Sequence, residues 1–283
     1  MSRNVAVTNM LAKALPAPER EAHAPFHLSV PHGSCAGGHW TICGNRKVYS
    51  NSHNDPPHET CCSCLMLSIG IGGEWDYEKF VMKRRCHVHA FDPTVVLLQK
   101  HKKQFAAIRN ESRNGRLHFH NLGLGASTAM RTSYNKHKST GRDLSDVVQL
   151  DVMMARYALG RRVDVLKIDC EGCEYGAFDY LIERAPRLLC NVTQLNIELH
   201  TQTHGYPSLV NASQLTRLLR HAWIDHGFRV FKAASNAGWK EAARSVHPTL
   251  VKEWGFPSYG CCHNVQMVRP GGRLDGTASP ACS

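Results

Sequence analysis

Apolar and polar residues follow one another along this chain in a pattern that predicts a regular succession of strands and helices. Short apolar runs with sharp boundaries are typical of strands buried in a parallel sheet. The longer segments between them place their apolar residues on one side, as amphipathic helices do. We expect strands at 65–69, 87–91, 116–122, 163–168, 194–199, 228–234 and 264–270, and helices at 75–85, 94–110, 143–159, 174–185 and 213–227.

This order of elements predicts an α/β fold with a doubly wound, mostly parallel seven-stranded sheet of the Rossmann-like kind. Helices separate the first six strands, and the last strand is reached without one, which suits such a sheet. The chain has 283 residues, enough to bury a sizeable core. We expect the domain at 40–270, a mobile or irregular N-terminal extension at 1–39 and a flexible C-terminal tail at 271–283.

The segment 64–92 carries the clearest functional signal. Gly70, Gly72 and Gly73 follow the first strand at once, and glycine allows positive φ and a close approach of the backbone to a ligand. The next strand ends at Asp92, about twenty residues on, where nucleotide-binding folds place an acid against the ribose hydroxyls. The third glycine of the dinucleotide pattern is missing. This disfavours a flat-lying pyrophosphate and suits S-adenosylmethionine, which has no phosphate; an ordinary strand-to-helix turn is the alternative.

Four further polar residues stand at strand ends. Asp169 and Glu171 follow the fourth strand, and Glu198 and His200 end the fifth. The carboxyl ends of parallel strands lie on one side of a sheet, so we expect these side chains to meet there. They are candidates for catalysis, and we interpret His200 as the general base because free histidine titrates nearest neutrality.

Each assignment has a structural alternative. Glu171 could stabilise a helix N-terminus, His200 could bond to a neighbouring backbone group, and Asp92 could cap the helix that follows it. Our assignment includes no metal. The alternative is a divalent-metal site made of the same carboxylates and histidine, suited to Mn²⁺ or Fe²⁺ rather than Mg²⁺.

Composition narrows the class of protein. Hydrophobic residues make up 42% and charged residues 20%, as in globular proteins, and no apolar run approaches the length of a transmembrane helix. The net charge is +11, but its carriers are dispersed and are not interleaved with aromatic residues. We therefore expect no nucleic-acid partner. The N-terminus lacks the apolar region of a signal peptide.

Cysteine usage leaves the compartment open. The chain has twelve cysteines, and together with sequons at 110–112, 191–193 and 211–213 they are compatible with an oxidising secretory lumen. We expect a disulfide such as Cys43 to Cys64, or free thiols, rather than a zinc site, because the spacings lack two regular ligand pairs. Cys170 and Cys173 have the spacing of a redox pair, which we interpret as coincidental because no thioredoxin-like context surrounds them.

The motifs as a set resemble those of the FkbM-related methyltransferase-like proteins. The segments SIGIGGEWDYE, HAFDPT, FHNLGLG, VDVLKIDCEGCEY and QLNIELH occur in that family's order, and the most specific is the Lys-Ile-Asp-x-Glu-Gly-x-Glu core at 167–174. The resemblance spans about 40–270. Cys170 and Cys173 depart from it, since apolar or small residues are expected there.

This resemblance implies a class I S-adenosylmethionine-dependent methyltransferase. By it, Gly70 and Gly72, with Gly73 in the same turn, line the methionine side of the cofactor, and Asp92 binds the ribose. Leu122 and Gly123 would border the adenine, and Asp169 would lie near the sulfonium or the acceptor. Members of the family methylate hydroxyl groups, so the implied activity is O-methylation of a small molecule or glycan.

Two other functions remain as alternatives. An NAD(P)-dependent oxidoreductase would require a third glycine and a tyrosine–lysine pair four positions apart, which Tyr175 and Tyr180 do not provide. A non-catalytic relative would keep the fold without turnover. Polar loops at 126–142, 201–212 and 236–262 are expected to form the acceptor pocket.

Overall fold

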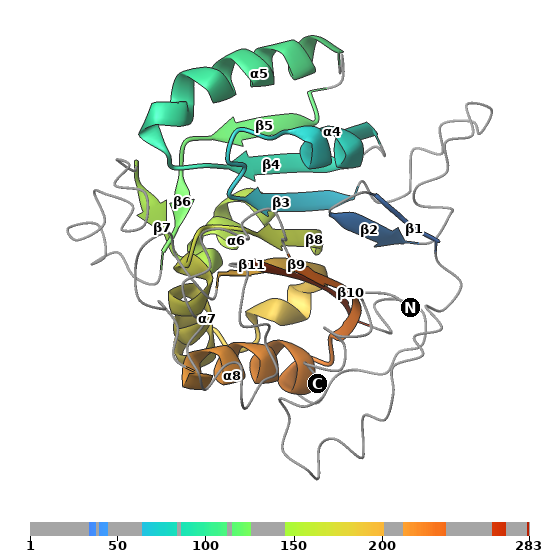
Figure 1. The fold of residues 1–283 in the computed structure, drawn as a ribbon, viewed down its shortest axis with the longest axis vertical. Helices are drawn as coiled ribbons and strands as arrows, with labels where there is room; N and C mark the ends of the chain where they lie inside the picture. The colour runs from blue at the N-terminus through green and yellow to red at the C-terminus, as the bar shows by residue number, and fades with distance from the viewer. Residues whose placement is uncertain are drawn as a thin grey trace.

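A seven-stranded sheet forms the centre of the protein (Figure 1). The computed structural model describes residues 34–37, 40–44, 64–83, 86–111, 115–125, 145–200, 212–235, 262–269 and 282. In spatial order the strands are β10 (Arg229–Ser235), β11 (Cys262–Val268), β9 (Val192–His200), β8 (Val163–Ile168), β3 (Leu65–Ile69), β4 (His87–Phe91) and β5 (Leu117–His120).

The sheet is mostly parallel, as predicted. Strand β3 pairs in parallel with β4 on one side and β8 on the other, whereas β11 runs antiparallel to both β9 and β10. All five residues of β3 are buried, which explains why four of them are apolar and why Ser68 is the one polar residue of the strand. The chain proceeds outward from β3 in both directions, so the strand order reverses beside it. The carboxyl ends of β3 and β8 are therefore the expected ligand site.

Helices cover both faces of this sheet. One face packs against α4 and α5, and the other packs against α6, α7 and α8. The helices are α4 (Asp76–Lys83), α5 (Leu98–Glu111), α6 (Leu150–Ala158), α7 (Cys173–Arg184) and α8 (Ala212–Arg220), with short helical turns η1 (Val95–Leu97), η3 (Leu188–Asn191) and η4 (His221–Asp225). Among the described residues, no helix has the length and apolar character needed to cross a membrane.

The helix predicted at 143–159 begins later than expected. It starts at Leu150, and the preceding valines form β7 (Val147–Val148), which pairs in parallel with β6 (Gly123–Leu124). β-Branched residues favour extended backbone, and the Gly125 amide donates to the Val148 carbonyl at 2.9 Å. In Figure 1 the arrowheads of β3, β4 and β5 point toward β6 and β7, which thus border the carboxyl edge of the sheet.

The terminal segments are described only in part. A hairpin of β1 (Ser34–Gly37) and β2 (Thr41–Gly44) crosses the expected boundary at residue 40, and the ring of Trp40 lies 6.2 Å from that of Tyr77. Within 271–283, Cys282 is joined to Cys190 by a disulfide. The rest of both segments, and the loops 126–142, 201–211 and 236–261, lie outside the described residues, so those expectations stay predictions.

The expected Cys43–Cys64 disulfide is wrong, because Cys64 is bonded to Cys86. Each of these two cysteines directly precedes a strand, and the paired strands begin in register, with Leu65 opposite His87. The two Cα atoms consequently lie 4.3 Å apart, a separation that only the pairing of β3 with β4 produces.

The central strands carry two contrasting rows of side chains. Leu67, Leu166, Leu195 and Met267 occupy paired positions on β3, β8, β9 and β11, and all four are fully buried in the core beneath α6, α7 and α8. The adjacent row, on the opposite face, consists of Ser68, Lys167, Asn196 and Gln266. These are almost as completely buried, at 0 to 3% exposure. We call them the apolar row and the polar row.

Candidate active site

The glycine turn after β3 has the backbone shape that its sequence predicts. Gly70 and Gly72 have φ of +78° and +61°. A Cβ atom on Gly70 would lie 1.6 Å from the carbonyl oxygen of Asp169, so only glycine lets the ends of β3 and β8 approach this closely. A Cβ atom on Gly72 would meet nothing within 4 Å. The turn therefore has open space on the Gly72 side.

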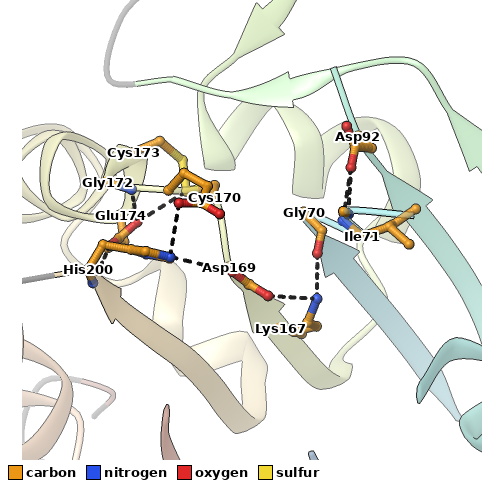
Figure 2. A network of polar contacts seen from close by, with 12 residues as sticks. Gly70, Ile71, Asp92, Lys167, Asp169, Cys170, Gly172, Cys173, Glu174 and His200 are labelled. Carbon is orange, nitrogen blue, oxygen red and sulfur yellow. Dashed lines mark hydrogen bonds and ion pairs between the residues drawn. A yellow bond between two sulfur atoms is a disulfide. The ribbon is translucent and has the colours of Figure 1, made fainter. Parts of the chain in front are cut away.

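Asp92 at the end of β4 holds this turn in place. Its Oδ2 accepts hydrogen bonds from the amides of Ile71 and Gly72, at 3.1 and 2.8 Å (Figure 2). Its Oδ1 accepts from the amide of Thr94 at 2.9 Å, and His101 Nε2 lies 3.4 Å from Oδ2. Asp92 thus supports the glycine turn and also holds Thr94, the N-cap residue of η1.

The ionisation of Asp92 follows from these contacts. Burial by itself would raise the pKa of this carboxyl group, but the neighbouring His101 ring and the hydrogen bonds from Thr94 and Gly72 lower the pKa to about 2. The group is therefore a carboxylate at neutral pH, which the proposed contact with ribose hydroxyls requires. That contact stays a prediction.

The remaining predicted cofactor residues lie around the same edge. Gly73 follows in the turn, where a Cβ atom would lie 2.7 Å from Lys100 Nζ. Leu122 is buried in the core, and Gly123 begins β6, where a Cβ atom would lie 2.7 Å from the side chain of Pro93. Close packing thus explains the glycine at 123, and the role of 122–123 beside the adenine stays a prediction.

Lys167 links the turn to the acids at the end of β8. Its Nζ donates to the carbonyl of Gly70 and lies 3.4 Å from Asp169 Oδ2 (Figure 2). Burial would lower the pKa of this ammonium group, but Asp169, Glu78 and Glu198 raise it above its usual value. A charged lysine is therefore fixed between the glycine turn and the carboxylates.

His200 is surrounded by carboxylates. Its Nδ1 lies 2.9 Å from Glu174 Oε1, and its Nε2 lies 3.8 Å from Asp169 Oδ1 and 3.6 Å from Glu171 Oε2. Burial would lower the pKa of this imidazole, but the charge and hydrogen bond of Glu174, followed by the charges of Asp169 and Glu171, raise it to about 10. The predicted role as general base is disfavoured because the ring is already protonated near neutral pH.

Glu198 has the pKa near neutrality that was expected of His200. Burial raises the pKa of its carboxyl group, and the charge of Asp169 raises it further, while His200 and Lys167 oppose this rise, so that the pKa is about 7. The side chain is only 6% exposed. A carboxyl group that titrates near neutrality can accept a proton effectively at physiological pH.

Glu171 stands at the exposed rim of the group. Its φ of +58° is unusual for a residue with a side chain, and half of its side chain is exposed. It precedes α7 and is not the acid in that helix's first turn, which is Glu174. The structural alternative for Glu171 as a helix-stabilising carboxylate therefore applies to Glu174, whose Oε2 accepts from the Gly172 amide at 3.0 Å.

Sequence reasoning gave no role to three residues of this arrangement: Lys167 and Glu174, which begin and end the motif at 167–174, and His101. All are almost fully buried ionisable side chains. Lys167 interrupts an apolar strand, which is a usable signal because a lysine is rarely buried without a charged partner. His101 lies on α5, whose many polar residues hide it, and only the packing shows that Trp75 Nε1 donates to its ring at 3.2 Å.

Some of these residues bring possible metal-ligand atoms close enough together to share one ion. In the described part of the chain, ligand atoms of Glu198, His200 and Cys262 lie within 4.8 Å of one another, as do those of Cys170, Cys173 and Glu174. Each group contains a cysteine that is in a disulfide, which removes the thiolate that would bind a metal. Neither group is the set of carboxylates and histidine considered from the sequence.

Comparison with known proteins identifies the family. A family model described as a methyltransferase domain matches residues 26–246. No curated protein sequence matches the chain. The fold is similar to that of the methyltransferase FkbM from Methylobacillus flagellatus, at 15% identity and a TM-score of 0.43, over 72% of this chain and 43% of that one.

Two further solved structures are similar at lower identity. One is TrmK from M. capricolum in complex with S-adenosyl-homocysteine, at 7% identity and a TM-score of 0.37, covering 74% of this chain and 63% of that one. The other is an rRNA methylase from Streptococcus thermophilus, at 7% and 0.35, covering 73% and 87%. This chain thus spans less than two thirds of FkbM and of TrmK. The assignment depends on the family model alone, and this chain belongs to the methyltransferase-domain family.

Proposed function

We propose that this protein transfers a methyl group from S-adenosylmethionine to a hydroxyl group of a small molecule or glycan. The observation that carries the proposal is the buried carboxyl group of Glu198, whose pKa of about 7 suits a general base. It stands among Lys167, Asp169 and His200 beside the glycine turn. A hydroxyl acceptor needs such a group because it must lose its proton when it is methylated.

The turn after β3 fits the cofactor. Gly72 has open space where a side chain would otherwise stand, and the amides of Ile71 and Gly72 are fixed by Asp92. Bound S-adenosylmethionine would supply an electrophilic methyl group. In this proposal Gly70, Gly72 and Gly73 hold its methionine side, Asp92 its ribose, and Leu122 and Gly123 border its adenine.

In the proposed reaction each charged group of the site has its own role. Glu198 accepts the acceptor's proton, and Asp169 orients the hydroxyl group in line with the methyl group. Lys167 and His200 supply positive charge that stabilises the ionised carboxylates when Glu198 is unprotonated. Glu171, at the rim, lies where it can contact the acceptor.

The nature of the acceptor is inferred from charge. The net charge of +11 is spread along the chain, and the described part of the site is rich in carboxylates, which repel a polyphosphate backbone. A neutral hydroxyl compound is therefore favoured over RNA.

Two measurements test the proposal. Calorimetry with S-adenosylhomocysteine should give binding at micromolar concentration, and its absence at high micromolar concentration would contradict the cofactor site. A mass-spectrometric screen of glycans and small hydroxyl compounds should give a product that is fourteen daltons heavier. Methylation of RNA alone would overturn the proposed acceptor and leave the cofactor site intact.

A further inference from the structure

The disulfide between Cys170 and Cys173 lies inside the site just described (Figure 2). It follows Asp169 directly and closes at the first residue of α7. Both cysteines are half-buried, so an external thiol can reach them. By contrast, Cys64 and Cys86 are 4% and 0% exposed at the opposite edge of the sheet.

A buried carboxylate connects this disulfide to the histidine. Glu174 is 0% exposed, and its Oε2 lies 3.4 Å from Cys170 Sγ. That is a distance at which a thiol can donate to a carboxylate. Its Oε1 lies 2.9 Å from Nδ1 of His200 and also accepts from the His200 amide at 2.9 Å. A continuous path for a proton thus runs from His200 through Glu174 to the sulfur of Cys170.

The other sulfur stands at a helix N-terminus. Cys173 begins the twelve-residue helix α7, and the positive end of a helix dipole stabilises a thiolate. Thiol–disulfide exchange requires an accessible sulfur, stabilisation of the departing thiolate and a group that delivers the proton. The three requirements are met at Cys170, Cys173 and Glu174.

We propose that Cys170 and Cys173 form a redox-active couple that exchanges with dithiols, and that its reduction alters the pairing of Glu174 with His200 at the methyl-transfer site. The exchange itself is independent of the proposed acceptor, and the coupling depends on the cofactor site alone. The spacing of the two cysteines is therefore functional, contrary to the interpretation from the sequence.

The electrons and protons balance as follows. A thiolate of the dithiol attacks Cys173 Sγ, the bond between Cys173 and Cys170 breaks, and Cys170 Sγ leaves with the electron pair and takes a proton through Glu174. The second thiol of the reductant then gives up its proton, which replaces the one taken by Cys170, attacks the mixed disulfide and releases Cys173 as a thiolate. The protein gains two electrons, and the reductant ends as its own disulfide.

Reduction has a consequence for the neighbouring histidine. The new thiol of Cys170 donates to Glu174 Oε2 and partly neutralises the carboxylate that holds His200. When the Glu174–His200 pair is weaker, His200 holds its positive charge less strongly beside Asp169 and Glu171. The affinity of the neighbouring cofactor site therefore changes.

The exchange is tested on the folded full chain with dithiothreitol. Aliquots equilibrated across a range of reduced-to-oxidised dithiothreitol ratios are alkylated and digested, and each disulfide is followed by mass spectrometry. We expect the Cys170–Cys173 pair to become reduced while Cys64–Cys86 remains oxidised. Simultaneous reduction of both, or resistance of Cys170–Cys173 until the protein unfolds, would overturn the proposal.

Two variants test the parts played by Glu174 and by coupling. Glu174→Gln should slow reduction of the pair by about 10²-fold, the lower end of general acid–base effects, whereas Glu183→Gln on the same helix should not; equal rates would remove Glu174 from the mechanism. S-adenosylhomocysteine affinity should differ between the reduced and oxidised protein by about fivefold or more, and Cys170→Ala/Cys173→Ala should abolish this difference. Equal affinities with normal exchange would overturn the coupling alone, and no binding in either state would count against the cofactor site instead.

Discussion

The apolar row and the polar row lie on the same four strands and have nearly equal burial, yet they stabilise the protein in different ways. Leu67, Leu166, Leu195 and Met267 contribute by being removed from water. Ser68, Lys167, Asn196 and Gln266 require partners to be buried at all. Ser68 Oγ donates to Glu78 at 2.5 Å, and Asn196 Nδ2 donates to the hydroxyl of Tyr77 at 2.9 Å.

The difference indicates which face carries the chemistry. Both rows are covered by helices, but strands β8 and β9 carry further polar residues beyond the polar row: Asp169, Glu198 and His200 at the carboxyl edge. Because strand residues two apart share a face, Lys167 and Asp169 point to one side, as do Asn196, Glu198 and His200. The side chains of the polar row thus lie on the same side of β8 and β9 as those of the candidate active site.

The largest expected effect is on the rate of methyl transfer and comes from Glu198, which follows Asn196 of the polar row on β9. Glu198→Gln keeps the shape of the side chain and removes its ability to accept a proton, so methyl transfer should fall about 10²- to 10⁴-fold. The fold should remain, as checked by thermal unfolding. The exposed Glu183→Gln is the control and should leave the rate unchanged; an active Glu198→Gln protein would assign the base to another residue.

A substitution in the apolar row should lower the stability of the protein and leave the rate of methyl transfer almost unchanged. Leu166→Ala creates a cavity beneath α7 and should lower the free energy of unfolding by about 2–5 kcal/mol, measured by urea unfolding. Methyl transfer per folded molecule should change little. Val152→Ala, on the exposed side of α6, is the control at about 0.5 kcal/mol or less, and a similar loss there would mean that the buried row has no special importance.

Asn196→Ala tests whether the polar row depends on its hydrogen bonds. The substitution removes the partner of Gln194 Nε2 and of the Tyr77 hydroxyl, so the free energy of unfolding should fall by about 1–3 kcal/mol. In the double variant with Tyr77→Phe the two losses should not add, because they concern one hydrogen bond. Additive losses would contradict a connected network.

The pH dependence sharpens the comparison further. Because the folded pKa of Glu198 is raised from 4.5 to about 7, methyl transfer should increase with pH up to about 7, with up to about tenfold per unit below it. Stability should move the other way. The fold favours the protonated carboxyl group, so its contribution is complete below pH 4.5 and is lost as the pH rises through 7. Both dependences should disappear in Glu198→Gln, and persistence of either would assign it to another group.

Three disulfides have both cysteines among the described residues, and they differ in what they stabilise. In the chain-entropy description, the loops closed by Cys190–Cys282, Cys64–Cys86 and Cys170–Cys173 correspond to about 4.6, 3.4 and 1.9 kcal/mol respectively. Of these three, the pair in the candidate active site thus contributes least to stability, which is consistent with the proposed reversible role.

Much of the fold could be predicted from the sequence, because it depends on local patterns. Mainly apolar segments such as 65–69 and 163–168 predicted the parallel strands, and the glycines at 70 and 72 predicted the positive φ of the turn. The start of α6 was missed because Val147 and Val148 become a strand only through pairing with Gly123 and Leu124, residues that are distant in the sequence.

The sequence by itself determined the succession of the seven central strands along the chain, the glycine turn and the placing of Asp92, Asp169, Glu198 and His200 at strand ends, because spacing and periodicity are local properties. Only the tertiary structure decided their ionisation. Burial raises the pKa of Glu198 to about 7, and the carboxylates around His200 raise that of the imidazole to about 10. It also paired Cys64 with Cys86 and placed Glu174 between Cys170 and His200, since these contacts arise from strand register and helix docking.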